Sequence, residues 1–400
     1  MEKFINRPEY ISFLERHANK PLIKVVSGVR RSGKSTLFKI FQEKLINQGV
    51  EENQVIAINF EDMAFQDLLD YKSLYQYIIE RLHSDKMTYI FLDEIQWVDS
   101  FERVVDSLLL KDAVDIYITG SNAYFLSDEL ATLLTGRYVQ LDILPLSFKE
   151  FVSAQKEPVS LQEHYNQYIK SSFPYTVNIN DDQERFEYLQ GIYSTIILND
   201  IVKRLGIQDV DLLERIIATL FSSIGSLVTI NKIKNTLNSQ GYKIAHQTID
   251  RYISGAKSAL VLYSAQRFNI HGRKLLENQS KYYVVDMGLR QFVLRDHLED
   301  FGHILENIIF LELKRRNYTV YVGQSHQREV DFVAVKPDKS VEYYQVALTT
   351  LDEDVLRREL ASLQAINDQY PKYLLTLDTL NPHANYDGII KMNALDWLMA

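Results

Sequence analysis

The sequence predicts an α/β fold that is divided among several domains. Over the first 145 residues, short β-branched or aromatic runs alternate with longer amphipathic stretches, which is the pattern of a sheet covered by helices. Apolar residues then recur at helical spacing as far as about residue 223, and the last hundred residues return to alternating strands and helices. The 400 residues exceed what one core holds, since single cores stop growing near roughly 250 to 300 residues.

The first predicted domain, residues 1–146, begins with a strand at Leu22–Val26. A helix follows at Lys34–Gln48 and ends before Gly49. Four further apolar runs are predicted to be strands, and Pro145 closes the last: Val55–Phe60, Thr88–Leu92, Asp115–Thr119 and Tyr138–Ile143.

A helical connector or lid is predicted at residues 147–223, with one break at Ser171–Pro174. A smaller domain at 224–292 then contains two helices, a turn and two strands, in an order that predicts a winged helix. Its elements are helix Ile230–Asn238, the turn at Gly241, helix Gln247–Ala259 and strands on either side of His271–Lys274.

The last predicted domain, residues 293–400, repeats the α/β pattern. Its elements are helix Gly302–Arg316, strands Tyr318–Val322, Glu329–Val335 and Val341–Leu348, helix Asp354–Asp368 and strand Tyr373–Leu377.

Composition excludes several classes of protein. The chain has no cysteine, which excludes disulfides, thiolate catalysis and zinc sites that depend on sulfur. The start at Met1–Arg7 is charged and no apolar run reaches roughly 18 residues, so we expect a cytoplasmic, soluble protein with no membrane partner. A net charge of −9 argues against binding nucleic acid along the whole surface, but ten Lys or Arg against three acids make residues 229–290 basic.

Residues Gly28–Ser35 satisfy the pattern G-x-x-x-x-G-K-[ST], directly after a predicted strand and before a predicted helix. The glycines let the backbone wrap closely around phosphates, which then face the amides of the helix N-terminus. Lys34 is expected to reach the β- and γ-phosphates of ATP, and the Ser35 hydroxyl to bind Mg²⁺. The predicted ATP-binding residues are Gly28, Arg30, Arg31, Ser32, Gly33, Lys34, Ser35 and Thr36.

Two acids follow the predicted strand Thr88–Leu92 at its carboxyl end, where open α/β sheets bind ligands. Asp93 is expected to hold Mg²⁺ through its water shell, and Glu94 to polarise the attacking water. After a phosphate-binding loop, this pair favours hydrolysis over binding alone. The alternative is an acidic, solvated strand end.

Asn122 and Arg137 are two further candidates for catalysis. Asn122 follows the strand Asp115–Thr119 and either contacts the γ-phosphate as a sensor or caps the next helix. Arg137 either neutralises charge in the transition state as an arginine finger or lies on the surface.

With these residues placed, the chain resembles the prokaryotic family of AAA-type P-loop ATPases that join an N-terminal ATPase domain to a C-terminal domain of unknown function. The resemblance covers nearly the whole chain. It rests on several motifs together: Gly28–Leu37, Phe91–Gln96, Thr119–Asn122, Leu134–Arg137, Pro145–Phe148, Lys281–Tyr283, Asp286–Leu289 and Glu329–Phe332.

The resemblance implies a winged helix in the middle of the chain and a restriction-endonuclease-like α/β domain at the end. It also favours the catalytic interpretations of Asn122 and Arg137. One departure is Ser171–Pro174, where the family usually has glycines before the proline. We therefore expect this connector turn to be built differently.

An active nuclease of that type needs an acid on its first helix, an aspartate on one strand and E/Q-x-K on the next, because two carboxylates hold Mg²⁺ while a lysine assists the nucleophile. Glu306, Asp331 and Gln345 fit the first three places, but Ala347 stands at the lysine position. We expect the fold to be retained and cleavage to be lost.

Together these interpretations predict an ATPase whose nucleotide state changes the posture of the connector and of the two C-terminal domains. Three functions remain possible for the parts controlled by the nucleotide: a switch acting on duplex DNA through residues 229–290, a switch that docks a protein partner, and an ATP-dependent nuclease. On DNA, helix Gln247–Ala259 would enter a groove and Arg273–Lys274 would contact phosphate. A homo-oligomer is also open, since Arg137 acts either in its own subunit or on a neighbour's nucleotide.

Overall fold

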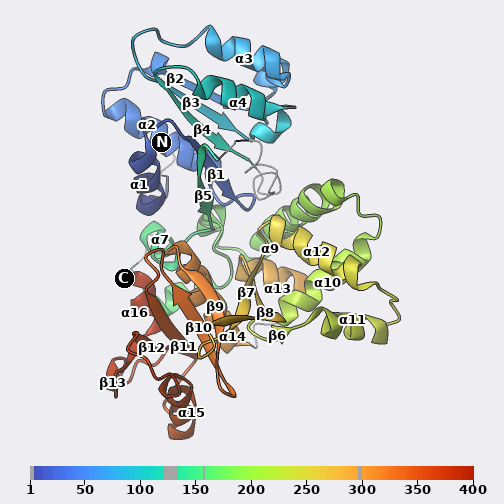
Figure 1. Ribbon diagram of the computed structural model, residues 1–400, viewed down its shortest axis with the longest axis vertical. Helices are drawn as coiled ribbons and strands as arrows, with labels where there is room; N and C mark the ends of the chain where they lie inside the picture. Colours follow the sequence, from blue (N-terminus) through green and yellow to red (C-terminus); the bar gives the residue numbers. More distant parts are fainter. Residues whose placement is uncertain (1–3, 121–133, 135, 156–157, 296–299) are drawn as a thin grey trace. The chain divides into compact units, whose positions relative to one another are not determined.

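The computed structural model describes residues 4–120, 134, 136–155, 158–295 and 300–400 (Figure 1). The chain divides into two units, Met1–Pro145 and Leu146–Ala400, and each is described by itself. No helix in the described ranges is long and apolar enough to cross a membrane.

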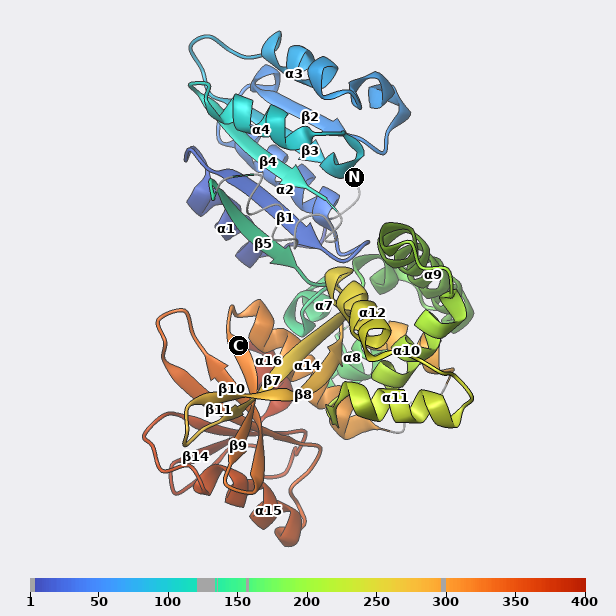
Figure 2. The ribbon, with the colours of Figure 1, turned by 45° about the vertical axis from the view of Figure 1, so that its right-hand side comes forward.

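Unit 1 contains a five-stranded parallel sheet in the order β2-β3-β4-β1-β5 (Figure 2). Strand β4 therefore lies between β1 and β3, and the carboxyl ends of all the strands meet at one edge. The strands are β1 (Ile23–Gly28), β2 (Val55–Asn59), β3 (Thr88–Asp93), β4 (Val114–Thr119) and β5 (Tyr138–Ile143).

Helices cover both faces of this sheet, so its central strands β1, β3 and β4 are buried on both sides. In β3, Tyr89 and Phe91 pack with α1 and α2, whereas Ile90 and Leu92 pack with α3 and α4. This alternation follows from the two-residue period of a strand. The helices are α1 (Pro8–His17), α2 (Lys34–Asn47), α3 (Tyr71–Ile79) and α4 (Phe101–Leu109), with short 3-10 turns at Glu52–Gln54, Met63–Leu68 and Ile95–Trp97.

The α/β prediction for this unit is confirmed, and the five predicted strands agree with the observed ones to within two residues. Helix α1 was not among the predicted elements. It begins at Pro8, whose fixed φ suits the first turn of a helix, and it buries Tyr10, Ile11 and Leu14.

Unit 2 begins with a helical part that contains a buried turn at the break seen in the sequence. Asp286 accepts hydrogen bonds from the Ser172 amide at 2.6 Å and from the Ser172 hydroxyl at 2.7 Å, and Ser171 donates at 3.3 Å. The serines that depart from the family pattern thus bind this carboxylate. The helices are α7 (Phe148–Ala154), α8 (Leu161–Tyr168), α9 (Asp182–Thr195), which continues as a π-helix (Ile196–Lys203), and α10 (Val210–Ser222), with a 3-10 turn at Pro174–Asn178.

The middle segment of unit 2 has the order α10, β6, α11, α12, β7, β8, and β8 pairs with both β6 and β7. This order agrees with the expected one, while the winged-helix assignment itself stays a prediction. The elements are β6 (Leu227–Val228), α11 (Ile230–Ser239), α12 (His246–Ser258), β7 (Leu262–Asn269), β8 (Lys274–Val284) and α13 (Met287–Leu294).

The six C-terminal strands, the middle hairpin β7–β8 and the short strand β6 form one nine-stranded sheet, in the order β13-β14-β12-β11-β10-β9-β7-β8-β6. Its remaining elements are α14 (Phe301–Arg315), β9 (Thr319–Ser325), β10 (Arg328–Val335), β11 (Val341–Ala347), α15 (Glu353–Gln364), β12 (Lys372–Thr376), β13 (Ala384–Tyr386), β14 (Ile389–Asn393) and α16 (Ala394–Met399).

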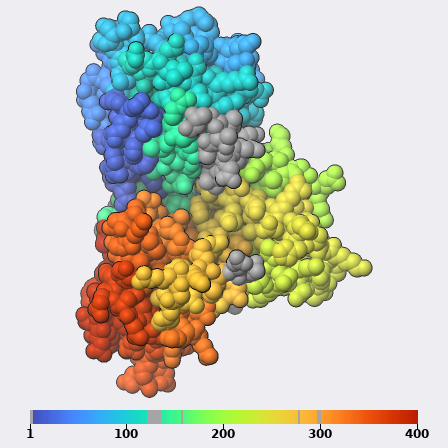
Figure 3. Space-filling view, in the orientation of Figure 1, coloured from blue at the N-terminus to red at the C-terminus, as the bar shows by residue number. Residues whose placement is uncertain are grey.

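The junction between the two parts of this sheet lies at β7 and β9, which pair in parallel from Arg267 with Val322 to Asn269 with Gln324. The atoms of the β7–β8 hairpin are continuous with those of the C-terminal strands (Figure 3). The turn after β7 is also attached, because Ile270 donates to the Gln324 carbonyl at 3.0 Å and the His271 ring lies 3.0 Å from the Ser325 hydroxyl. The predicted boundary at 292/293 therefore falls between parts that share a sheet, and the four-domain division stays a prediction.

Candidate active site

The loop between β1 and α2 is shaped by two glycines. A Cβ atom on Gly28 would lie 2.5 Å from the Ile143 carbonyl oxygen, so only glycine allows this approach of β1 to the end of β5. Gly33 precedes α2 with a φ of 99°, a conformation that other residues rarely adopt. The first amides of α2 then face the loop without helical partners of their own.

Two side chains of this loop fit a phosphate. The Ser32 hydroxyl is buried and has no hydrogen-bond partner among the described residues, so it can donate a hydrogen bond to a bound phosphate. Lys34 is also buried. Its ammonium donates to the Gly28 carbonyl at 3.1 Å and lies 3.7 Å from the Glu94 carboxylate, both within the same site.

Asp93 ends β3 beside the start of α2. Its carboxylate accepts hydrogen bonds from the hydroxyls of Ser35 and Thr119, so the two predicted Mg²⁺ residues are in contact. Burial raises the pKa of Asp93, and the two hydroxyls lower it only in part. A bound cation would favour the charged form of this carboxylate.

Glu94 has a positive φ of 56°, which turns the chain sharply after β3. The Glu94 amide donates to the Thr119 hydroxyl at 2.9 Å, and the same hydroxyl donates to Asp93. Thr119, at the end of the neighbouring β4, therefore fixes both acids. On its other side, the Glu94 carboxylate accepts a hydrogen bond from the Gln96 amide at 2.5 Å.

Glu61 is a third acid at this edge of the sheet, and the sequence analysis did not identify it. It follows β2, whose Asn59 pairs with Asp93. Burial and the charge of Glu94 raise the pKa of Glu61, while Arg30 opposes them with its guanidinium 3.8 Å away. The signal in the sequence was an acid placed after a strand, as with Asp93.

Arg7 is a second residue that the sequence analysis missed. Its guanidinium is buried and donates to the carbonyls of Ser32 at 2.8 Å, Leu144 at 2.8 Å and Pro145 at 3.2 Å. It thereby connects the phosphate-binding loop to the end of unit 1. The partners lie 25 to 138 residues away, so no local pattern indicates them.

The described contacts of Arg137 are not with the other candidate catalytic residues of the same chain. Its carbonyl accepts from the Ile23 amide, and its guanidinium lies 3.3 Å from Asp106. The contact with Ile23 places the Arg137 backbone at the amino-terminal edge of the sheet, whereas Gly28 lies at the carboxyl edge, one strand length or roughly 17 Å away along the backbone. Asn122 lies outside the described residues.

In unit 2, Lys281 lies among three carboxylates. Its ammonium is 3.0 Å from Glu306, 2.8 Å from Glu329 and 3.5 Å from Asp331, and Tyr283 donates to Glu306 at 2.7 Å. Burial lowers the pKa of Lys281, but the three carboxylates outweigh it and raise that pKa well above its usual value.

Gln345, which the sequence predicts as a site residue, also lies beside this cluster. Its side-chain oxygen accepts a hydrogen bond from the backbone amide of Asp331 at 3.3 Å. Ala347 ends β11, so the lysine that the sequence lacks at that position is contributed to the acids by β8 instead.

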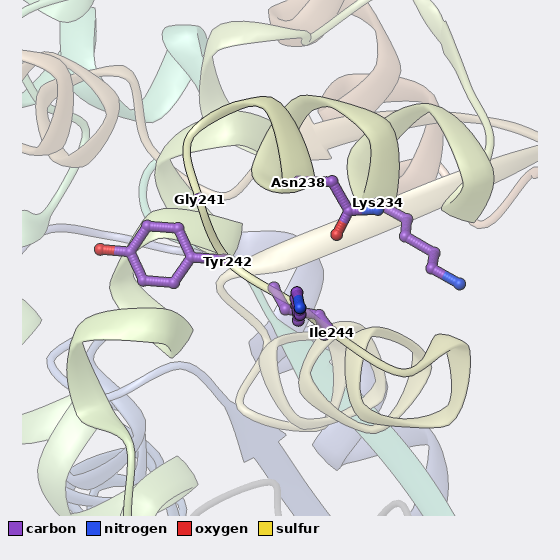
Figure 4. Close-up of a pocket in the computed structure, with 6 residues that line it drawn as sticks. Lys234, Asn238, Gly241, Tyr242 and Ile244 are labelled. Carbon is purple, nitrogen blue, oxygen red and sulfur yellow. The ribbon is translucent and has the colours of Figure 1, made fainter.

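A concave surface on the middle segment is lined by Lys234, Asn238, Gly241, Tyr242, Lys243 and Ile244 (Figure 4). The side chains of Lys234 and Tyr242 extend in opposite directions, so they do not converge on a small ligand. The two lysines belong instead to the basic surface that the sequence predicts for residues 229–290.

The parallel sheet, the loop and the acids at its carboxyl edge define an AAA-type P-loop domain, which binds nucleotide. Residues 20–152 match the family described as "AAA domain", and residues 162–300 match "Domain of unknown function (DUF8612)". Among solved structures, the Walker-type ATPase PABY2304 of Pyrococcus abyssi has a similar fold, with a TM-score of 0.52 and 16% identity over 74% of this chain and 97% of that one.

Two relatives match almost the whole chain. A Haemophilus influenzae protein described as "Uncharacterized protein" is 37% identical over 400 residues, 99% of this chain and 98% of that protein. An uncharacterized protein of Methanocaldococcus jannaschii is 32% identical over 396 residues, 95% of this chain and 84% of that protein. The chain belongs to the family that contains these two proteins.

Proposed function

We propose that the chain hydrolyses ATP with Mg²⁺ and that its nucleotide state controls unit 2. The observation that carries the proposal is the meeting of Lys34, Ser35, Asp93 and Glu94 at one edge of the sheet. Ser35 and Asp93 would hold Mg²⁺, which when bound neutralises charge on the β- and γ-phosphates. Lys34 would bind phosphate and thereby release Glu94 to accept a proton from the attacking water.

The test compares Lys34→Ala with Glu94→Gln in the full chain. We expect Lys34→Ala to lose affinity for a fluorescent ATP analogue. Glu94→Gln should bind the analogue like the wild type and release phosphate at least about 100-fold more slowly. Equal loss of affinity in both variants would show that Glu94 has been misassigned.

Arg7 supports coupling between the nucleotide and the rest of the chain. Its guanidinium contacts both the Ser32 carbonyl in the loop and the carbonyls of Leu144 and Pro145, the last two residues of unit 1. A displacement of the loop on ATP binding would change these contacts where the chain continues into unit 2.

Asn122 and Arg137 are proposed as the residues that sense nucleotide. Asn122, three residues after β4 in the sequence, would contact the γ-phosphate, so Asn122→Ala should lower kcat more than ATP affinity. Arg137 would act on the nucleotide of a neighbouring subunit, because its place at the amino-terminal edge separates it from the loop of its own chain.

Duplex DNA is the first candidate for the output. Helix α12 exposes six polar or charged residues, among them the cations Arg251 and Lys257; the others are His246, Gln247, Asp250 and Ser254. Lys234→Ala/Lys243→Ala should weaken DNA binding and reduce its dependence on salt, because phosphate contacts release counterions. Lys39→Ala/Lys111→Ala, on exposed lysines of unit 1, is the control.

A protein partner is the second candidate, and the hairpin turn favours it. In a DNA-binding winged helix this turn would reach phosphate, but here Ile270 and His271 hold it against β9. An ATPase rate that does not change when duplex DNA is added would favour this candidate. So would a DNA-binding curve of Lys234→Ala/Lys243→Ala that equals that of the wild type.

Nuclease activity is the third candidate, and the Lys281 contacts weigh against it. An ammonium group lies among the carboxylates that would have to bind a divalent ion, so the two cations would compete for one place. Mg²⁺-dependent nicking that is abolished by Asp331→Ala would restore the nuclease hypothesis.

A further inference from the structure

Gln96 has no role in the function described so far, although it belongs to the motif Phe91–Gln96. It lies in the 3-10 turn Ile95–Trp97, directly after Glu94. The positive φ of Glu94 and the hydrogen bond from the Trp97 amide to the Glu94 carbonyl, at 3.2 Å, make this turn compact. The side chains of Glu94 and Gln96 therefore meet.

The orientation of the Gln96 amide follows from its neighbour. The Glu94 carboxylate only accepts hydrogen bonds when ionised, so the NH₂ group of Gln96 must face it, at 2.5 Å. The amide oxygen then faces away. This oxygen is buried and has no donor among the described residues.

A buried acceptor without a donor is unusual in a folded protein and calls for a partner that the described residues do not supply. The donor must fit beside Glu94, whose other carboxylate oxygen lies 3.7 Å from Lys34. Water is the donor that ATP hydrolysis requires at this place, and it carries two protons for two acceptors.

We propose that Gln96 orients the attacking water: its NH₂ group donates to the Glu94 carboxylate and its buried oxygen accepts a hydrogen bond from the water, whose second hydrogen faces Glu94. The inference rests on the proposed ATP hydrolysis. In that reaction the water oxygen bonds to the γ-phosphorus while the bond to the bridging oxygen breaks, and its electron pair leaves with ADP. Glu94 accepts one proton of the water and returns it to the released phosphate, while the other hydrogen stays on the oxygen that has joined the phosphorus.

The experiment measures phosphate release and nucleotide affinity of Gln96→Met, which has nearly the same length and shape but neither hydrogen bond. We expect kcat to fall about 100-fold, with KM and the affinity for a fluorescent ATP analogue within about twofold of the wild type. Gln96→Glu keeps the oxygen but loses the donor and places a second carboxylate beside Glu94. It should be no more active than Gln96→Met, whereas Gln96→Asn, which keeps the amide, should recover part of kcat.

The matched control is Gln76→Met. Gln76 donates to Glu80 at 2.8 Å on the exposed face of α3, so this variant removes the same kind of pair away from the site. It should have wild-type kcat and KM.

The outcomes separate this inference from the function on which it rests. Wild-type turnover with a silent Glu94→Gln and a fully active Gln96→Met would overturn the role of Gln96 alone. A parallel loss of kcat and affinity in Gln96→Met, with no recovery in Gln96→Asn, would reduce Gln96 to a structural residue and overturn it as well. A silent wild type would overturn both proposals.

Discussion

Arg7 joins two segments of unit 1 that are far apart in the sequence. Its guanidinium supplies the hydrogen bonds of three carbonyls from two distant segments, and it is buried. Hydrogen bonds to a charged group contribute about 1.5 to 3 kcal/mol each, and an orphaned buried acceptor carries a penalty of its own. Arg7→Ala should therefore lower the stability of unit 1 by about 3 kcal/mol or more and weaken ATP binding.

Hydrogen exchange of the amides of β1 and β5 measures this effect locally. Arg16→Ala, on the exposed side of α1, is the control and should change stability by less than about 0.5 kcal/mol. Equal protection of β1 in the two variants would contradict the anchoring role of Arg7.

The Asp331 carboxyl gives unit 2 a pH dependence of predictable sign. Burial raises the pKa of Asp331 to about 7, and the charge of Glu306 adds to this, while Lys281 opposes it. The folded state then binds the proton more tightly than the unfolded chain, whose aspartates titrate near about 3.9. The stabilisation is present below about pH 4 and is lost as the pH rises to about 7.

Asp331→Asn removes this titration, so the free energy of unfolding of unit 2 should depend less on pH between about 4 and 7. Fluorescence of Trp397, which is buried in α16, reports unit 2 in a Trp97→Phe background. Asp354→Asn, on an exposed aspartate of α15, should leave the pH dependence unchanged. A steeper decline in Asp331→Asn than in the wild type would refute the assignment.

At the residue scale, local patterns could predict Lys34, Ser35, Asp93 and Glu94 as site residues, because strand, loop and helix follow one another directly in the chain. The contacts of Thr119 and Arg7 could not be predicted, since they join residues 25 or more positions apart. Lys281 illustrates the same limit: Ala347 indicated a missing lysine, but β8 brings one to the acids from another part of the sheet.

At the scale of elements, Gly323 determines how closely β9 approaches its neighbours. A Cβ atom there would lie 2.9 Å from the side chains of Val330 and Val333 and 3.1 Å from that of Ile270. Gly323→Ala should destabilise unit 2 by about 1 to 3 kcal/mol, because core side chains would have to move. Urea unfolding followed by Trp397 fluorescence measures the change.

Gly302→Ala is the matched control, since a Cβ atom there meets no other atom within 4 Å. It lies in the first turn of α14, where alanine should be neutral or add up to about 1 kcal/mol. Equal midpoints for the two variants would show that β9 has room to adjust.

Most strands could be predicted because each shows its own apolar pattern, but their order in a sheet could not. The sequence of the hairpin at 262–284 is typical of the wing of a winged helix. No pattern near it in the sequence indicates that β7 pairs with β9, more than 50 residues later. Pairing between distant strands depends on main-chain hydrogen bonds that any sequence can make, so it leaves no pattern in the sequence.

At the scale of the whole molecule, the position of Arg137 bears on whether one subunit or two subunits form a complete ATPase site. Within unit 1 the hydrogen bond from Ile23 places the Arg137 backbone at the edge of the sheet opposite Gly28. The Arg137 backbone lies one strand length, roughly 17 Å, from Gly28, and its guanidinium contacts Asp106, so we expect any catalytic role to join the Arg137 of one subunit to the phosphate-binding loop of another.

A mixing experiment tests this arrangement. Arg137→Ala keeps its ATP site but lacks the arginine, whereas Lys34→Ala keeps the arginine but cannot hold phosphate, so each should be inactive alone. If Arg137 acts across an interface, equal amounts of the two variants should recover up to about a quarter to a half of wild-type phosphate release. The recovery should increase with total protein concentration, because the interface forms by mass action.

A second pair and a control complete the test. Glu94→Gln mixed with Arg137→Ala should also recover activity, since Glu94→Gln still carries Arg137. Lys34→Ala mixed with Glu94→Gln should stay inactive, because neither variant has a complete ATP site. No recovery in either pair containing Arg137→Ala, together with a specific activity of the wild type that is independent of concentration, would assign the whole reaction to one chain and overturn the role of Arg137 across an interface.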